Sequence, residues 1–406
     1  MEEKRNVPKL RFPGFTDSWE QRRLGEIGSV AMCKRVYKDQ TTEAGDVPFF
    51  KIGTFGGEPD AFISNELFEK YRELYSFPKV GDILISAAGT IGRTIVYQGE
   101  RAYYQDSNIV WLNHDERLDN SFFLQYLNNQ TWSSLEGSTL KRLYNKDILD
   151  ANIALPKPDE QHRIGALFRK LDSLIALHQR KLDHVKELKK GLLQKMFPKE
   201  GANVPELRFP GFTDPWEQRR LGEIGSARSG VGFPNAEQGG SEGTPFYKVS
   251  DMNLEGNEFQ LRRANNYVTN EQIERKRWKP INEVPAMFFA KVGAAVLLNR
   301  KRLVDEPFLL DNNTMAYSFD RRFWDVAFGR ILFDGLDLTS LVQVGALPSY
   351  NASDIESMEV AIPSKIAEQA KIGALFQKLD SLIALHQREL DHVKELKKGL
   401  LQQMFV

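Results

Sequence analysis

The chain has 406 residues with 55 basic and 55 acidic side chains, so its formal net charge is zero. This balance argues against a protein that holds nucleic acid unaided, because neutralising phosphates requires a local surplus of lysine and arginine; a DNA-binding surface must come from patches or from partners that add charge. No apolar run reaches the ~18 residues of a membrane-spanning helix. Cys33 is the single cysteine, which excludes a disulfide framework and indicates a reducing, cytoplasmic location.

The chain contains one frame twice. Residues 10–29 (LRFPGFTDSWEQRRLGEIGS) return as residues 207–226, and only Ser18 against Pro215 differs. Residues 164–197 return as residues 372–405, with the changes Arg169 to Gln377, Lys181 to Glu389 and Lys195 to Gln403. The two stretches between these copies have diverged widely. A duplicated frame around two different inserts predicts one scaffold that presents two different recognition surfaces.

The repeats divide the chain into six expected segments. In chain order these are a leading segment (1–29), a first recognition domain (30–158), a first long helix (159–198), a linker with a second leading segment (199–226), a second recognition domain (227–366) and a second long helix (367–406). Each repeat is the size of a domain, which excludes a solenoid of short repeats.

Both inserts have the pattern of mixed α/β domains with short strands. Strands are expected where β-branched and aromatic runs are bounded by Gly, Pro or Asn, at Val47–Thr54, Asp82–Ser86, Thr94–Gln98, Asn108–Leu112, Thr244–Ser250, Ala286–Phe289 and Met315–Phe319. Short motifs keep their places in both copies, such as Tyr144-Asn145 and Tyr350-Asn351. We therefore expect the two inserts to share one fold with different surface loops.

The most strongly patterned elements are two long helices, Glu160–Phe197 and Glu368–Phe405. Apolar residues recur at heptad spacing and form one broad stripe, in which we place Leu174 and Leu382 at a helix–helix seam. The pattern predicts a coiled pair, parallel or antiparallel; the alternative is that each helix packs on its own insert. The expected fold class is α+β: two mixed α/β recognition domains separated by a pair of long, packed, coiled-coil-like helices in a pseudo-two-fold internal repeat.

Motifs for catalysis are absent from the sequence. There is no Pro-Pro pair for an adenine-methylating loop and no G-x-x-x-x-G-K-[ST] loop for ATP. His178 and His184 lie six residues apart on the helix, so they are expected to face different sides, and we predict no metal site. The sequence thus predicts a protein that is not an enzyme by itself.

The order of motifs resembles the specificity (S) subunits of type I restriction-modification systems along essentially the whole chain. The resemblance rests on FPGFTDxWEQRRLGEI, on GDILISAAGTIGRT, and on the helical block IGALFxKLDSLIALHQR, with the first and last present twice. It implies two target-recognition domains that each read one half of a bipartite double-stranded DNA target. It also implies that the helices bind two methyltransferase (M) subunits, that restriction (R) subunits join the full complex, and that S-adenosylmethionine, ATP and Mg are bound by those partners.

The candidate DNA-binding residues are polar and basic positions on the expected insert loops. Arginine and lysine can pair with guanine, asparagine can pair with adenine, and basic groups also hold phosphates. In the first insert they are Lys34, Arg35, Lys51, Thr54, Ser86, Thr90, Arg93, Asn108, Lys141, Arg142, Tyr144 and Asn145. In the second they are Lys248, Ser250, Asn253, Lys291, Asn299, Arg300, Lys301, Asn312, Asn313, Ser349, Tyr350 and Asn351. Dense basic clusters at Lys141-Arg142 and around Arg300-Lys301 carry the most weight in this prediction.

Two other functions are compatible with the same sequence. The chain could be a stand-alone DNA-binding or decoy protein that works without restriction or methylation partners. It could also be a structural scaffold without a DNA role. Stoichiometric co-purification of M subunits would favour the first function, and tight DNA binding by the isolated chain would favour the decoy.

Overall fold

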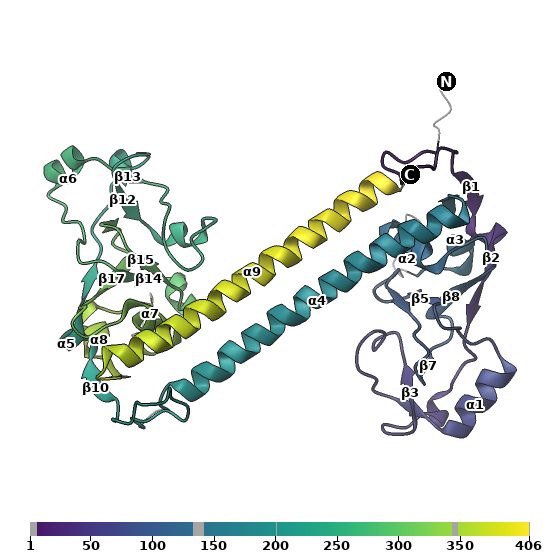
Figure 1. Cartoon of the computed structure of the whole chain (residues 1–406), viewed down its shortest axis with the longest axis horizontal. Coiled ribbons are helices and arrows are strands. Elements are labelled where there is room, and N and C mark those ends of the chain that lie inside the picture. The colour runs from purple at the N-terminus through teal and green to yellow at the C-terminus, as the bar shows by residue number, and fades with distance from the viewer. Residues whose placement is uncertain (1–5, 133–141, 200, 343–347, 406) are drawn as a thin grey trace. The chain divides into compact units, whose positions relative to one another are not determined.

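A computed structural model describes residues 6–132, 142–199, 201–342 and 348–405 (Figure 1). The chain divides into two compact units. Unit 1 comprises Met1–Arg180 and Gln387–Val406, and unit 2 comprises Lys181–His386. Among the described residues, no helix is long and apolar enough to cross a membrane.

The described residues of unit 1 form three small sheets with the strand orders β1-β9, β2-β8-β5-β6 and β4-β3-β7. The strands are β1 (Glu20–Arg23), β2 (Gly28–Met32), β3 (Val47–Phe50), β4 (Phe62–Ile63), β5 (Ile83–Ser86), β6 (Thr94–Val96), β7 (Tyr103–Tyr104), β8 (Ile109–His114) and β9 (Asn152–Leu155). The helices of the insert are α1 (Asn65–Leu74), α2 (Asn120–Asn129) and α3 (Asn145–Leu149). All pairs are antiparallel except β3 with β7.

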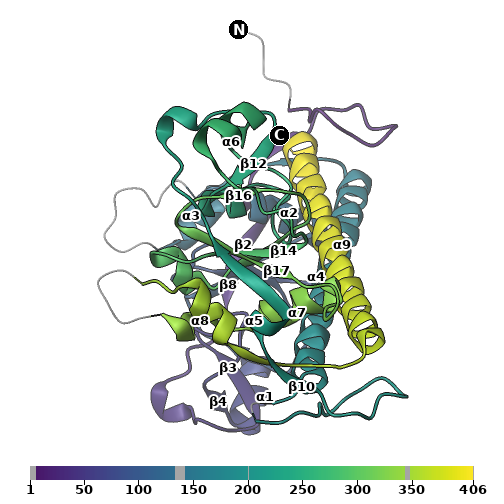
Figure 2. The same cartoon turned by 90° about the vertical axis from the view of Figure 1, so that its left-hand side faces the viewer.

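Unit 2 repeats this topology with the orders β10-β18, β11-β17-β14-β15 and β13-β12-β16 (Figure 2). The strands are β10 (Glu217–Arg220), β11 (Gly225–Ser229), β12 (Thr244–Tyr247), β13 (Tyr267–Val268), β14 (Ala286–Ala290), β15 (Lys301–Val304), β16 (Leu309–Leu310), β17 (Thr314–Phe319) and β18 (Glu359–Ile362). Its shorter helices are α5 (Leu221–Ile224) in the leading segment and α6 (Asn270–Lys276), α7 (Val326–Gly335) and α8 (Ala352–Ser357) in the insert. The predicted common fold of the two inserts is therefore confirmed.

The two long helices are confirmed as α4 (Pro158–Met196) and α9 (Ile366–Met404). In unit 1, Asp172 near the start of α4 forms an ion pair with Lys397 near the end of α9, with Oδ1 and Nζ 2.6 Å apart. In unit 2, Lys189 near the end of α4 lies 2.5 Å from Asp380 near the start of α9. Within each unit the helical segments are thus antiparallel, which decides between the two directions left open by the sequence.

Each unit holds the start of one long helix and the end of the other in one hydrophobic core. In unit 1, Phe168 of α4 and Met404 of α9 are both buried with Phe122 of α2. In unit 2, Phe376 and Met196 take the same places around Phe328 of α7. The long helices therefore pack both on each other and on the inserts. Both arrangements that the sequence allowed, a helix pair and packing of each helix on its insert, occur in the structure.

Leu174 is not a seam residue, and this part of the sequence prediction is wrong. Its side chain is 42% exposed, whereas Leu171, three residues earlier, is 6% exposed and packs in the core. Positions three residues apart on a helix are rotated by roughly 300°, so Leu171 and Leu174 point in directions about 60° apart. The apolar stripe of α4 is therefore wider than its contact with α9. One edge of the stripe is buried and the other edge faces solvent.

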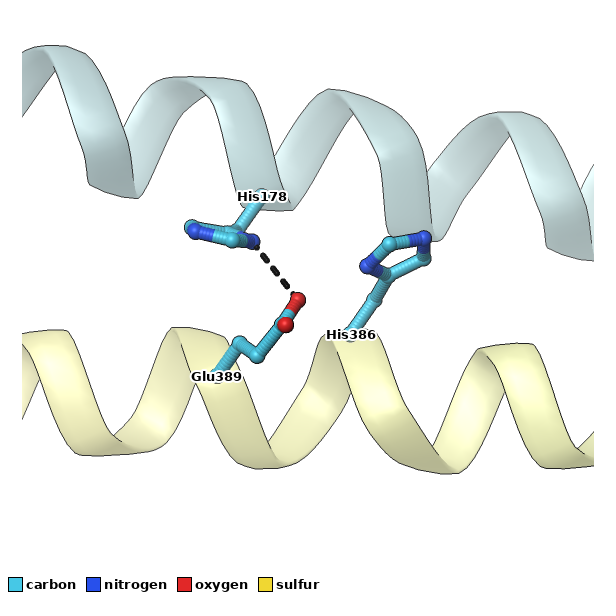
Figure 3. Close-up of side chains that lie close together, drawn as sticks. All are labelled: His178, His386 and Glu389. Atoms are coloured by element: carbon cyan, nitrogen blue, oxygen red, sulfur yellow. Dashed lines mark ion pairs between the residues drawn. The ribbon is translucent and has the colours of Figure 1, made fainter.

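A second contact between α4 and α9 in unit 1 involves Glu389, one of the three positions at which the two helical copies differ. Figure 3 shows His178 of α4 facing Glu389 of α9, with Nδ1 and Oε2 3.1 Å apart. The position equivalent to Glu389 in the first copy is Lys181. The two copies are therefore not interchangeable in charge at this point.

The leading segment of each repeat is tied to the start of its own long helix by a buried ion pair. The Arg11 guanidinium donates two hydrogen bonds to the Glu160 carboxylate, at 2.8 Å and 2.7 Å. Arg208 and Glu368 repeat this geometry at 2.9 Å and 2.7 Å. Both glutamates are almost fully buried, so each pair fixes the leading segment against the helix.

Candidate nucleic-acid interface

In unit 1 three of the candidate residues, Arg35, Asn108 and Arg142, meet at the short loop 105–108, between β7 and β8. Arg35 pairs with Asp106 in this loop, with Nε and Oδ2 2.8 Å apart. From the other side, Arg142 donates from Nη2 to the carbonyl oxygen of Ser107 at 2.7 Å. Two arginines distant in sequence are thereby brought to one loop.

The backbone of that loop is strained. Ser107 has a φ of +51°, in the left-handed region that non-glycine residues seldom adopt. Such conformations persist where surrounding contacts fix them, and they concentrate at functional sites. Here the bond from Arg142 to the Ser107 carbonyl is one of those contacts.

The glycine-containing loop after β5 lies beside the 105–108 loop. The Ala87 backbone N–H donates to the Asn108 carbonyl at 2.8 Å. Ser86 Oγ hydrogen-bonds the Thr90 carbonyl and accepts from the Arg93 backbone N–H at 2.9 Å. Ser86 is buried, so its hydroxyl shapes the loop, while Thr90 and Arg93 are exposed. The fold thus turns a predicted contact residue into a positioning residue for its neighbours.

The candidate residues differ widely in exposure. The exposed ones are Lys34, Arg35, Thr90, Arg93, Tyr144, Asn145, Ser250, Asn253, Asn312, Asn313 and Asn351. The half-buried ones are Lys51, Thr54, Asn108, Arg142, Lys248, Lys291, Asn299, Arg300 and Ser349. The buried ones are Ser86, Lys301 and Tyr350, and Lys141 lies outside the described residues.

In unit 2 one group of candidates lies where β14 ends and the antiparallel β17 begins. The Lys291 backbone N–H donates to the Asn313 carbonyl at 2.9 Å, and the Lys291 carbonyl accepts from the Tyr350 N–H at 3.3 Å. The Tyr350 hydroxyl donates to the Ala290 carbonyl at 2.5 Å, which explains why this ring is 3% exposed. Its counterpart Tyr144 is 60% exposed. The same motif therefore presents a tyrosine in unit 1 and hides it in unit 2.

The basic cluster at Arg300 lies mostly on a strand. Lys301 is buried at the start of β15 and donates to the Asn299 side chain at 2.9 Å and to the Leu336 carbonyl at 2.5 Å. Burial lowers the pKa of Lys301 to about 8. Arg300 donates to Asn253 Oδ1 at 2.7 Å. Lys301 thus has a structural role, whereas Arg300 is half-buried.

The sequence reasoning missed an exposed basic segment in unit 2. Residues 262–279, which include β13 and α6, carry six basic and two acidic residues. All six basic side chains are exposed; two of them, Arg275 and Lys276, pair with Glu237. A local charge count along the chain would have found this segment, which the total charge of zero conceals.

Comparisons with known proteins agree with one another. The family described as "Type I restriction modification DNA specificity domain" matches residues 16–187. A protein of Haemophilus influenzae named as a type I restriction enzyme specificity subunit is 52% identical over 152 residues, covering 37% of this chain and 40% of that protein. The chain thus matches less than half the length of that relative. The type I restriction enzyme MjaIX specificity subunit of Methanocaldococcus jannaschii is 22% identical over 95% of this chain and 92% of its own length.

A solved structure shows the same fold. The crystal structure of the S subunit of a type I restriction-modification system from M. genitalium superposes with a TM-score of 0.64. The match has 16% sequence identity and covers 98% of this chain and 99% of the other. At this identity the likeness concerns the fold, which is that of two mixed domains joined by long helices.

Proposed function

We propose that this chain is a specificity subunit of a type I restriction-modification system and that each of its two inserts reads one half of a bipartite DNA target. The observation that carries this proposal is the contrast between frame and inserts. Both inserts have one strand order on a nearly identical frame. Their loops at matching places carry different side chains, such as Thr90 after Gly89 in one and Ala294 after Gly293 in the other.

The partners in this proposal are two M subunits, docked on the outer edge of the apolar helix stripe. In unit 1, Leu174 and Leu177 are 42% and 38% exposed on α4, and they border a shallow depression that Ala166 also lines. The same sequence recurs on α9, where Leu385 is 41% exposed in unit 2. Exposed apolar patches on a helix favour a protein partner, and a repeated patch favours two copies of one partner.

Chemistry belongs to the partners in this proposal. M subunits would bind S-adenosylmethionine and flip the target adenine. R subunits, with ATP and Mg, would add cleavage in the full complex. This chain would contribute recognition and positioning and would not be a catalyst itself.

The proposed function is tested by expressing the chain with and without its M subunit and sequencing modified adenines in host DNA. We expect a split motif to be methylated only when both are present, and the two proteins to purify together. Tight sequence-specific binding by the isolated chain, without any M subunit in the complex, would support the stand-alone or decoy function instead.

Arg142 provides a residue-level prediction. Because its guanidinium is held at the strained Ser107 loop, replacing Arg142 by alanine should weaken binding of the assembled complex by about 1–3 kcal/mol if it reads a base. A phosphate contact would instead weaken binding to all sequences and lower the salt slope by about one. Binding titrations at several salt concentrations separate the two cases.

Arg101 is the matched control for Arg142. It is an exposed arginine of the same insert. It pairs with Glu69 at 2.8 Å and donates to the Asn65 side chain, and neither partner belongs to the 105–108 loop or to the loop after β5. Replacing Arg101 by alanine should leave DNA binding unchanged. Equal losses for the two variants would show that Arg142 acts only through general charge.

A further inference from the structure

Unit 2 exposes two adjacent leucines at the tip of a short 3₁₀ helix, η6 (Ala294–Leu298), which follows β14. Leu297 is 58% exposed and Leu298 is 59% exposed. Full burial of a leucine side chain stabilises a protein by about 1.5–3 kcal/mol, so these two contribute little of that to the fold. Neighbouring exposed leucines of this kind mark contact surfaces.

The tip is held rigidly from below. Val296, the residue before the leucines, is buried in the core of unit 2. Before the turn, the Gly293 backbone N–H donates to the Pro348 carbonyl at 2.9 Å. After the turn, Asn299 has a φ of +49°, and its side chain donates to the Leu336 carbonyl at 3.0 Å and accepts from the Leu338 N–H at 3.1 Å. The leucines are thus presented on a fixed turn.

The tip lies in a basic stretch of the chain, and the exposed Asp334 and Asp337 lie on the adjoining segment around Leu336. Residues 291–304 contain four basic residues and no acidic residue. Arg300 donates to Asn253 from Nη1, yet its buried Nε has no hydrogen-bond partner within the described part of the chain. In the chain, the apolar tip lies between the cations Lys291 and Arg300. DNA is a matching partner, because it combines anionic phosphates with the apolar faces of stacked bases.

The corresponding loop of unit 1 has a different character. Gly89 matches Gly293 in the repeat, and the residue after it, Thr90, is polar and exposed. Ile91 packs against the core of unit 1, and a Cβ on Gly92 would lie 2.7 Å from Trp132 Nε1. The matching loop of unit 1, residues 89–92, therefore has no such apolar tip.

We propose that Leu297 and Leu298 form an apolar wedge that inserts between two base pairs of the DNA half-site read by unit 2. Leucine is one of the side chains that proteins use to open base steps, and the cations on either side would hold the flanking phosphates. This inference rests on the proposed function and adds a contact that reads the deformability of a base step, independently of hydrogen bonds to base edges.

The experiment uses the complex assembled with M subunits and duplexes that carry 2-aminopurine at successive positions of the second half-site. We expect one position to brighten on binding, because the base there loses its stacking. In the double variant Leu297→Ala, Leu298→Ala, that brightening should disappear and affinity should fall at least about tenfold. The salt slope should not change, because no cation is removed. The variant Leu297→Met, Leu298→Met should retain the wild-type behaviour.

Leu74→Ala is the control, since Leu74 of α1 is 62% exposed in the other insert and should have no effect. Unchanged affinity and unchanged fluorescence in the double alanine variant would overturn the inference. So would a loss of M subunits from that variant with normal DNA affinity in the remaining complex, which would assign the leucines to a protein contact. A wild-type complex without any sequence preference would instead remove the proposed function, so the two failures are distinguishable.

Discussion

Replacing Leu174 and Leu385 together by aspartate is expected to release both M subunits while the chain stays folded. Each leucine is about two-fifths exposed on its helix, so a charge there meets water in the free chain. In a complex the same charge would be buried against an apolar partner surface, which costs several kcal/mol. Affinity for each M subunit should fall more than about a hundredfold, and adenine methylation should fall to background. Co-purification and the mass of the complex measure this directly.

The control places the same charge on the buried side of the same stripe. Leu171 and Leu379 are 6% and 5% exposed and lie in the hydrophobic cores of units 1 and 2. Aspartate at these positions should prevent folding, which circular dichroism and solubility would report. M subunits that still bind the Leu174→Asp, Leu385→Asp chain at normal strength would show that docking occurs elsewhere.

Removing Arg11 should strongly destabilise unit 1. Glu160 is 1% exposed and both of its oxygens accept from Arg11, so alanine at position 11 leaves a buried carboxylate without its partner. Loss of one member of a buried pair costs about 3–5 kcal/mol. Arg208→Ala should have the same effect on unit 2 through Glu368. Denaturant unfolding followed by tryptophan fluorescence measures both, because Trp19 and Trp216 belong to the two leading segments.

An exposed ion pair in the same segment is the control for Arg11. Lys157 pairs with Asp17 at 2.5 Å, but both side chains are largely in solvent. Lys157→Ala should therefore destabilise unit 1 far less than Arg11→Ala, because ion pairs between solvent-exposed side chains contribute little to stability. If Arg11→Ala and Lys157→Ala unfold at the same denaturant concentration, the buried pair does not fix the leading segment.

The long helices were predictable because their apolar stripe repeats over many turns and occurs twice. Their direction was not, since parallel and antiparallel pairs both bring two apolar stripes together. Periodicity also could not separate Leu171 from Leu174, because both belong to the stripe and only the width of the contact with α9 distinguishes them. The contact width depends on the inserts, which share the core with the helices.

The candidate interface was predictable by residue type and only partly by place. Loops carrying Arg35, Ser107 and Arg142 meet through hydrogen bonds between segments far apart in the chain, which no local pattern reports. Tyr144 and Tyr350 occupy one motif, but the Ala290 carbonyl captures only the second hydroxyl. The density of basic residues around Arg300 likewise could not show that Lys301 is buried, because its partner Leu336 lies in another part of the chain.

The central claim is that the frame assembles the complex and each insert reads its own half-site. The most direct test exchanges Val30–Asp150 for the insert of a related chain and maps methylated adenines in host DNA. The exchange keeps β1 and β9, which frame the insert, and it keeps both long helices. We predict that one half of the methylated motif changes, while the other half and the spacing between them stay the same. A change in both halves would contradict the account.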